Sequence, residues 1–156
     1  MHDMLVRLYD LPDLEDALAE VAVHGVDIRR PLAPEKPAVV DWVRANFANQ
    51  AAEVEAAFKH EPATCFVAVR GGAILGFACY DVTCLNFFGP EGVAAGERGK
   101  GIGRALLLAT LHAQRAQGYA YSIIGGVGPA EFYAKTVGAV AIEGSTPGIY
   151  AARLGT

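Results

Sequence analysis

The stretch GERGKGIGRALL, Gly96–Leu107, places four glycines and three basic residues directly before an apolar helical run. Glycine is costly inside regular structure, but it allows a backbone to come close to another molecule. Because Gly101 and Gly103 carry no side chain, successive amides at the start of the helix can point at an anion, and the helix dipole favours negative charge there. Three basic side chains would add charge to the same rim. They are Arg98, Lys100 and Arg104. The stretch therefore predicts a phosphate-binding turn.

Two other phosphate-binding motifs do not fit this stretch. A Walker A loop requires GxxxxGK followed by Ser or Thr, whereas Lys100 is followed by Gly101 and Ala94 occupies the position of the first glycine. A dinucleotide fingerprint requires GxGxxG with an acidic residue about twenty positions further on, but residues 119–124 contain no acid. The alternatives to an anion-binding turn are a solvated basic loop that only begins a helix and a nucleotide-binding loop of another type.

Outward from the turn, hydrophobic periodicity predicts a single α/β domain over residues 1–156. Apolar residues at helical spacing indicate helices, which fall in residues 11–25, 37–47, 51–60, 102–117 and 129–137. β-rich runs indicate strands in residues 4–8, 64–70, 73–83, 85–95 and 119–127, followed by a terminal hairpin formed by 139–144 and 148–154. Gly71 and Gly72 predict a hairpin between two of these runs, and the proline-rich residues 26–37 predict a loop or an edge segment.

Composition limits the classes of function. With 53% hydrophobic residues, the chain can bury a continuous core in one domain. A formal net charge of −4 argues against nucleic-acid binding, which needs a basic face. The three cysteines lack CxxC spacing and the four histidines are scattered, so neither a metal site nor a disulfide framework is expected. The sequence shows no signal peptide, and no run approaches the ~20 apolar residues of a membrane span, so a cytoplasmic protein with reduced thiols is expected.

The residues ERGKGIGRALL fit the R/QxxGxG/A signature through Arg98, Gly101 and Gly103. In this respect, and in the order of its elements, the chain resembles the GCN5-related N-acetyltransferases (GNAT). The resemblance implies a central mixed, mostly antiparallel sheet of about seven strands flanked by helices. It also implies that the amides from about Gly99 to Arg104 hold the pyrophosphate of acetyl-CoA. The cofactor-binding residues expected on this basis are Val93, Ala95, Arg98, Gly99, Lys100, Gly101, Ile102, Gly103 and Arg104.

The resemblance also implies how the cofactor's arm is held. The backbone of Val93 and Ala95 would pair with the pantetheine amides as an added strand would, and the thioester would lie where the fourth and fifth strands splay apart. Gly89, Pro90 and Gly92 interrupt the strand pattern there, as is typical of a bulge or a close approach.

The catalytic residues implied by the resemblance are Tyr133 and Glu91. Acyl transfer to an amine needs a deprotonated nucleophile, stabilisation of the oxyanion and a proton for the departing thiolate. EFYAK resembles the family's motif in which a tyrosine is the acid, here Tyr133, and the Val93 amide is the expected oxyanion donor. The base is expected to be Glu91, with Asp81 as second candidate and a water chain as the alternative. An ordinary core tyrosine and solvated carboxylates are the structural alternatives.

Two departures from the family's pattern bear on the pantetheine arm. Gly126 stands where many relatives have asparagine, and Gly138 with Ala139 stands where they have GF. These changes predict altered packing around the arm. The doubled Gly125 and Gly126 predict a close approach of cofactor or substrate to the fifth strand.

Other residues carry weaker hypotheses. Cys79 or Cys84 as a covalent nucleophile is disfavoured, because no histidine lies nearby in the sequence. Arg29, Arg30 and Trp42 would lie on the acceptor side, where solvated basic residues and a core tryptophan are the structural alternatives.

The sequence thus predicts an acetyl-CoA-dependent N-acetyltransferase that acts on a primary amine of a small molecule or peptide by direct transfer in a ternary complex. The alternative from another class is a non-catalytic acyl-CoA-binding sensor or interaction module. Neither nucleic acid nor a membrane is expected as a partner, and no metal is expected. The resemblance and the apolar ending GIYAARL favour a homodimer.

Overall fold

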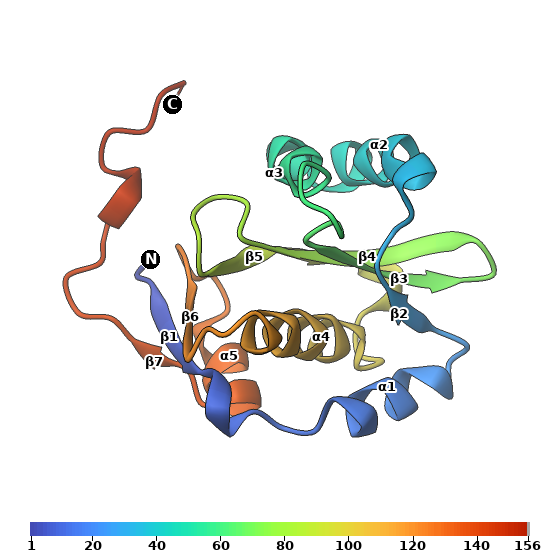
Figure 1. Ribbon diagram of the computed structural model, residues 1–156, viewed down its shortest axis with the longest axis horizontal. Helices are drawn as coiled ribbons and strands as arrows, with labels where there is room; N and C mark the ends of the chain where they lie inside the picture. Colours follow the sequence, from blue (N-terminus) through green and yellow to red (C-terminus); the bar gives the residue numbers. More distant parts are fainter. Residues whose placement is uncertain (156) are drawn as a thin grey trace.

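A computed structural model describes residues 1–155, which form one seven-stranded sheet in the order β2-β3-β4-β5-β6-β1-β7 (Figure 1). The strands are β1 (Met4–Arg7), β2 (Asp27–Arg29), β3 (Cys65–Arg70), β4 (Ala73–Tyr80), β5 (Phe87–Val93), β6 (Tyr121–Ile124) and β7 (Val140–Ala141). Neighbouring strands are antiparallel except for β5 and β6, which are parallel. The mixed, mostly antiparallel sheet is therefore confirmed.

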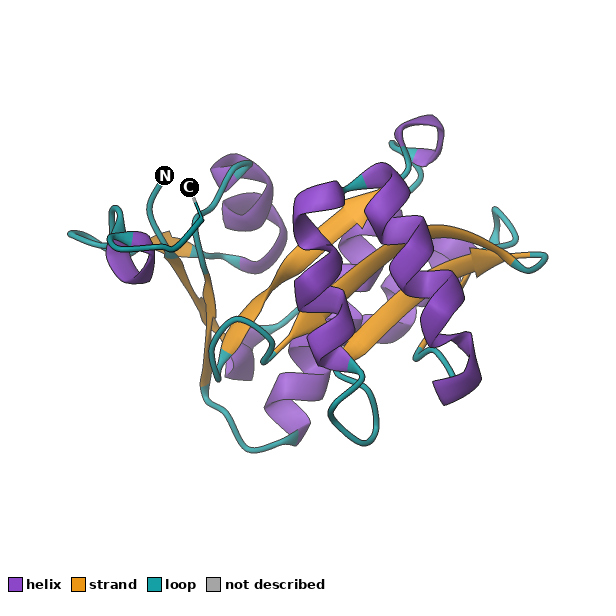
Figure 2. Ribbon diagram, turned by 90° about the horizontal axis from the view of Figure 1, so that it is seen from above, coloured by secondary structure: helices purple, strands orange, loops and turns teal. Residues whose placement is uncertain are grey.

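Five α-helices cover the two faces of this sheet. They are α1 (Leu14–Ala22), α2 (Lys36–Asn46), α3 (Ala51–Ala57), α4 (Ile102–Ala116) and α5 (Ala130–Val137). Helices α2 and α3 lie on one face, and α1 and α4 lie on the other (Figure 1). Seen from above, both termini lie at the same end of the molecule (Figure 2). No helix within residues 1–155 is long and apolar enough to cross a membrane.

The central helix α4 is held by its leucines. Leu106, Leu107, Leu108 and Leu111 are fully buried and belong to a core between the sheet, α1 and α5. Each fully buried leucine contributes roughly 2 kcal/mol. A second core under α2 and α3 packs against the opposite face. The start of α4 is thereby fixed rigidly beside the end of β5.

The sheet splays where β5 leaves β6. Only two residue pairs join these strands, Phe87 with Ile123 and Phe88 with Ile124. Beyond Phe88, β5 continues to Val93 with β4 as its neighbour, so the β6 side of this half-strand has no strand partner among residues 1–155. The expected opening between the fourth and fifth strands of the family's pattern is present here, between β5 and β6.

The terminal hairpin predicted from the sequence is wrong. Only two residues, Val140 and Ala141, form a strand, and they pair with β1. The backbone N–H of Asp3, which a longer strand would use, donates instead to the Ser145 hydroxyl at 2.8 Å. Pro147 has no backbone N–H and so cannot donate to a neighbouring strand. The segment Gly148–Tyr150 is instead a turn of 3-10 helix.

The remaining elements lie close to their predicted positions. The β3–β4 hairpin is confirmed, and the proline-rich segment contains the edge strand β2. Helix α3 ends at Ala57, three residues earlier than predicted from the position of Pro62. Helix ends fray in this way because their last carbonyls lack internal partners.

Candidate active site at the junction of two cavities

The glycine-rich turn exposes the N-terminus of α4. Gly101 precedes the first helical residue, Ile102, and adopts a left-handed conformation with φ +84°. At this φ any side chain would be strained, and a Cβ would also lie 2.7 Å from Glu20 Oε1 and displace it, which explains the glycine. Ile102 is buried and anchors the helix start. The backbone amides of the first turn are therefore available to an anion.

A groove of about 610 Å³ runs along this turn and the free half of β5. Seven of the predicted cofactor-binding residues line it: Val93, Arg98, Gly99, Gly101, Ile102, Gly103 and Arg104. Two others, Ala95 and Lys100, do not. A Cβ at Gly103 would lie between Glu91, Val93 and Phe132 at 3.7 to 3.9 Å, so this glycine keeps the groove open. These residues fit the binding of a pyrophosphate and a narrow chain.

The basic side chains do not all lie on the rim of this groove. Lys100 Nζ donates to Glu97 Oε2 at 2.7 Å. Arg70 binds the same carboxylate, and together, with Arg70 first, they lower the pKa of Glu97 to about 2. Arg104 pairs with Glu20 of α1 at 3.6 Å. Lys100 is thus bound by Glu97 and does not line the groove here, and its role beside Arg98 and Arg104 in binding an anion stays a prediction.

Arg98 closes the turn onto β5. Its Nε donates to the backbone carbonyl of Val93 at 3.3 Å. This carbonyl belongs to a backbone stretch predicted to pair with pantetheine. The signature arginine therefore positions the turn against the strand, and it occupies one of the acceptors on that edge.

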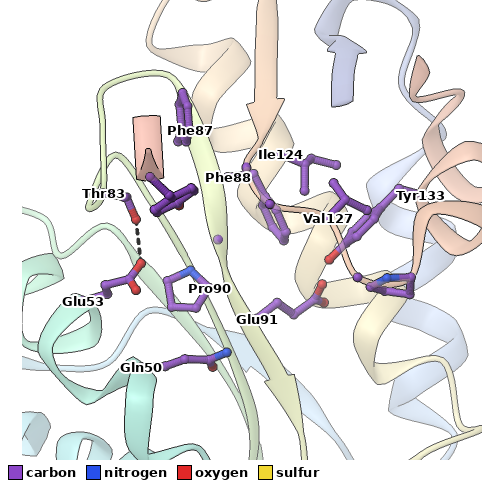
Figure 3. Close-up of a pocket in the computed structure, with 16 residues that line it drawn as sticks. Gln50, Glu53, Thr83, Phe87, Phe88, Pro90, Glu91, Ile124, Val127 and Tyr133 are labelled. Carbon is purple, nitrogen blue, oxygen red and sulfur yellow. Dashed lines mark hydrogen bonds between the residues drawn. The ribbon is translucent and has the colours of Figure 1, made fainter. Parts of the chain in front are cut away.

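A second cavity of about 350 Å³ lies on the far side of the same opening (Figure 3). Its walls come from the start of α3, the β4–β5 loop, β5 and the segment after β6. Three residues line both cavities, namely Glu91, Pro129 and Tyr133. The two cavities therefore meet where the sequence placed its candidate acid and base.

Tyr133 projects from α5 into this junction with 8% of its surface exposed. Its ring meets those of Phe132 and Phe88 edge to face, with centroids 5.2 and 6.1 Å apart. Burial raises the pKa of the Tyr133 hydroxyl well above its ordinary value, and the negative charge of Glu91 raises it further. The hydroxyl stays protonated at physiological pH and can donate its proton.

Glu91 projects from β5 toward the same point. Its Oε1 is enclosed and has no hydrogen-bond partner among the described residues, although the residue as a whole is only half-buried. Burial raises the pKa of the Glu91 carboxyl well above its ordinary value. In Figure 3 the carboxylate and the Tyr133 hydroxyl point toward each other. A carboxylate so desolvated is a stronger base than one in water.

The other candidate base is structural. Asp81 lines neither cavity, and its Oδ1 accepts the amide of Asn86 at 2.7 Å to close the β4–β5 loop. The covalent cysteine alternative also finds no support in the geometry. Cys79 faces Cys65 across β3 and β4, and burial raises its thiol pKa, while Cys84 lines neither cavity.

The residues predicted on the acceptor side serve the fold. Arg29 pairs with Glu35 at 2.7 Å. Arg30 donates to the carbonyl of Ala63 and stacks over Phe66 at 4.6 Å. Trp42 packs in the core under α2 against two phenylalanines. None of the three lines either cavity.

Several cavity residues were not predicted from the sequence. They are Gln50, Glu53, Thr83 and Tyr150. Gly125 has a role other than the one expected, because a Cβ there would lie 2.8 Å from the Phe87 ring and 3.5 Å from the Tyr150 hydroxyl. The glycine admits these two rings into the cavity wall. Nothing in the local sequence pattern marks these four residues, since they come from three separate segments.

The splayed sheet, the open helix start and the meeting of Glu91 and Tyr133 agree with the arrangement that the resemblance implies for an acyl-CoA-dependent acyltransferase. Residues 61–136 match the family model described as an acetyltransferase (GNAT) domain. This match spans just under half of the chain, and over it the chain is similar to the GCN5-related N-acetyltransferases. No curated protein matches it in sequence.

Solved structures share this fold at low sequence identity. A GCN5-related glucosamine N-acetyltransferase region of a fungal GH3 β-N-acetylglucosaminidase matches 90% of the chain with 16% identity and a TM-score of 0.75. A GCN5-related N-acetyltransferase from Sphaerobacter thermophilus matches 90% with 18% identity and a TM-score of 0.68. The chain spans only 19% and 48% of these two proteins. A GNAT family acetyltransferase from Brucella melitensis, solved with acetyl-CoA, matches 76% of the chain and 89% of its own length, with 20% identity and a TM-score of 0.56.

Proposed function

We propose that the protein transfers the acetyl group of acetyl-CoA to a primary amine of a small molecule or peptide, by direct transfer in a ternary complex. The observation that carries this proposal is the meeting of two cavities at Glu91 and Tyr133. The groove at the glycine turn would hold acetyl-CoA, with the amides from about Gly99 to Arg104 on its pyrophosphate. The second cavity would hold the acceptor.

Bound acetyl-CoA supplies an acyl thioester that is activated toward amines. The amine nitrogen would first form its bond to the acyl carbon, which places the negative charge on the carbonyl oxygen, and the carbon–sulfur bond would then break. Glu91 takes a proton from the amine, and Tyr133 gives its own proton to the departing sulfur. A buried base and a buried acid suit these opposite tasks, and each such group contributes about 10²- to 10⁴-fold to the rate. The backbone amide of Val93 would stabilise the oxyanion.

The proposal is tested by measuring CoA release with the purified protein over a broad panel of primary amines. Calorimetric titration with acetyl-CoA, and with ATP as the control ligand, runs beside it. Acetyl-CoA binding together with amine-dependent CoA release is the expected result. Binding without release for every amine would favour a non-catalytic sensor, and binding of ATP with no response to acetyl-CoA would favour a nucleotide-binding protein.

The remaining features of the proposal have their own tests. A homodimer in the cytoplasm is part of the proposal from the resemblance, although the segment that favoured dimerisation forms a turn here. Light scattering of the purified protein measures the assembly, and a monomeric mass would exclude the dimer.

A further inference from the structure

The two cavities at the active site differ in the charge of their walls. The groove at the glycine turn is lined by two basic residues, Arg98 and Arg104, which balance two carboxylates, Glu91 and Glu97. The second cavity is lined by two carboxylates, Glu53 and Glu91, and within residues 1–155 by no Lys, Arg or His. Figure 3 shows these carboxylates reaching the cavity from α3 and from β5, with Pro90 between them. The acceptor side therefore attracts positive charge at two separate places.

Buried oxygen atoms in this cavity lack donors. Gln50 Oε1 and Glu91 Oε1 are both enclosed, and neither has a hydrogen-bond partner in the described part of the chain. Leaving such an acceptor unpaired costs about 1 to 3 kcal/mol. Both atoms have almost no accessible surface, so an occupant with several N–H donors would satisfy them once the Gln50 and Glu91 side chains turn toward it. The cavity is thus complementary to a ligand rich in donors.

The position of Glu53 is fixed by the β4–β5 loop. Thr83 Oγ1 donates to Glu53 Oε2 at 2.5 Å, which ties the start of α3 to this loop (Figure 3). The carboxylate therefore stays at the cavity wall. The rings of Phe87 and Tyr150 line the same cavity. Aromatic faces attract cations, as carboxylates do.

We propose that the acceptor is a small diamine, whose reacting nitrogen lies at Glu91 while its second, cationic amino group is bound by Glu53 and Gln50. This inference rests on the proposed function and names its acceptor class. An amino acid would fit poorly, because its carboxylate would face two carboxylates with no cation in the cavity wall. A simple monoamine would bring no second cation to Glu53, whose carboxylate has the Thr83 hydroxyl as its neutral partner.

Three acceptors of matched chain length test the inference: 1,4-diaminobutane, 1-aminobutane and 4-aminobutanoate. A hydrogen bond to a charged group is worth about 1.5 to 3 kcal/mol, so kcat/KM for the diamine should exceed that for 1-aminobutane by about 10- to 100-fold. The value for 4-aminobutanoate should be the lowest. Preference for 4-aminobutanoate would overturn the inference and direct attention to Arg153, which lines the neighbouring hollow.

Variants connect the preference to Glu53. Glu53→Gln should lower the ratio of diamine to monoamine kcat/KM toward 1, mainly by raising KM for the diamine. Glu55→Gln makes the same charge change on the exposed side of α3 and should keep the ratio. Thr83→Val, which removes the hydrogen bond that positions Glu53, should lower the ratio partly. An unchanged ratio in folded Glu53→Gln protein would overturn the inference.

A binding measurement separates this inference from the proposed function. Titration of 1,4-diaminobutane into the CoA-bound protein needs no turnover. Diamine binding that is weakened by Glu53→Gln, without any acetyl transfer, would support the diamine site while overturning the proposed function. Acetyl transfer to 1-aminobutane and the diamine at equal efficiency would overturn the diamine site and leave the transferase standing. Neither binding nor transfer of any amine would overturn both.

Discussion

The Tyr133 hydroxyl and the Glu91 carboxylate point toward each other at the junction of the two cavities (Figure 3). Burial raises the pKa of both groups, and the charge on Glu91 adds to the rise at Tyr133. The same desolvation therefore makes the carboxylate a better base and keeps the phenol protonated. One dry junction supports both halves of the proposed proton transfer.

Tyr133→Phe should lower kcat by about 10²-fold or more, because the departing thiolate loses its proton donor. The binding constant for acetyl-CoA, measured by calorimetry, should stay close to that of the unmodified protein, since the ring and its aromatic contacts remain. Tyr9→Phe, at an exposed tyrosine outside both cavities, is the matched control. Full turnover in Tyr133→Phe would remove this residue from the mechanism.

Glu91→Gln should lower kcat and change its dependence on pH. In the unmodified protein the rate should rise as pH passes through the raised pKa of Glu91, because only the carboxylate can accept the amine's proton. The glutamine variant should be slow and should lose that rise. Rates measured from acid to neutral pH test this, and an unchanged profile would favour a water chain as the base.

The same substitution should stabilise the fold at neutral pH. Because the pKa of Glu91 is higher in the folded protein than in the unfolded chain, the folded state binds the proton more tightly, and stability falls as pH rises through this interval. Glu91→Gln removes this loss. Its Tm should exceed that of the unmodified protein at neutral pH, and the gap should narrow below the ordinary glutamate pKa of 4.5. A lower Tm for Glu91→Gln at neutral pH would show that other groups in the folded protein stabilise the charged carboxylate.

Gly103→Ala should weaken cofactor binding without destabilising the fold. In the protein as described, a Cβ there meets its neighbours at ordinary contact distances, and alanine in a helix is more stable than glycine by about 1 kcal/mol. The methyl group would project into the groove, so the affinity for acetyl-CoA should fall while Tm is kept or raised. Gly96→Ala, where a Cβ meets no atom within 4 Å and which lines neither cavity, is the control. Equal affinity for acetyl-CoA in both variants would show that the cofactor does not bind next to Gly103.

The turn and the junction were predictable because short patterns specify them. The glycines before an apolar helix predicted the position of the turn. The tyrosine of EFYAK and the carboxylate of β5 lie together in the structure, as the resemblance implied. The acceptor wall was not predictable, since Gln50, Glu53, Thr83 and Tyr150 meet only through long-range packing of separate segments. The ion pair of Lys100 was not predictable for a similar reason: the carboxylate that binds it also binds Arg70, which lies on β3.

Glu97→Gln should lower stability at neutral pH and strengthen cofactor binding together. The Arg70 and Lys100 partners hold the pKa of Glu97 at about 2 in the folded protein, below its ordinary value of 4.5. Glu97 therefore stabilises the fold above pH 4.5, and this contribution is lost as pH falls toward 2. The variant should be less stable than the unmodified protein at neutral pH, and the two should converge in acid. Unfolding monitored across this range measures the gap.

The second effect of Glu97→Gln depends on Lys100. Removing the carboxylate releases this lysine beside the turn and removes one negative charge from the groove, so the Kd for acetyl-CoA should fall, most clearly at low salt. Glu35→Gln is the matched control. The pKa of the Glu35 carboxyl is also lowered to about 2, by its pair with Arg29, and this pair lies away from the groove. This control should reproduce the stability change without altering Kd. Tighter binding in both variants would mean that overall charge, and not the release of Lys100, sets the affinity for the pyrophosphate.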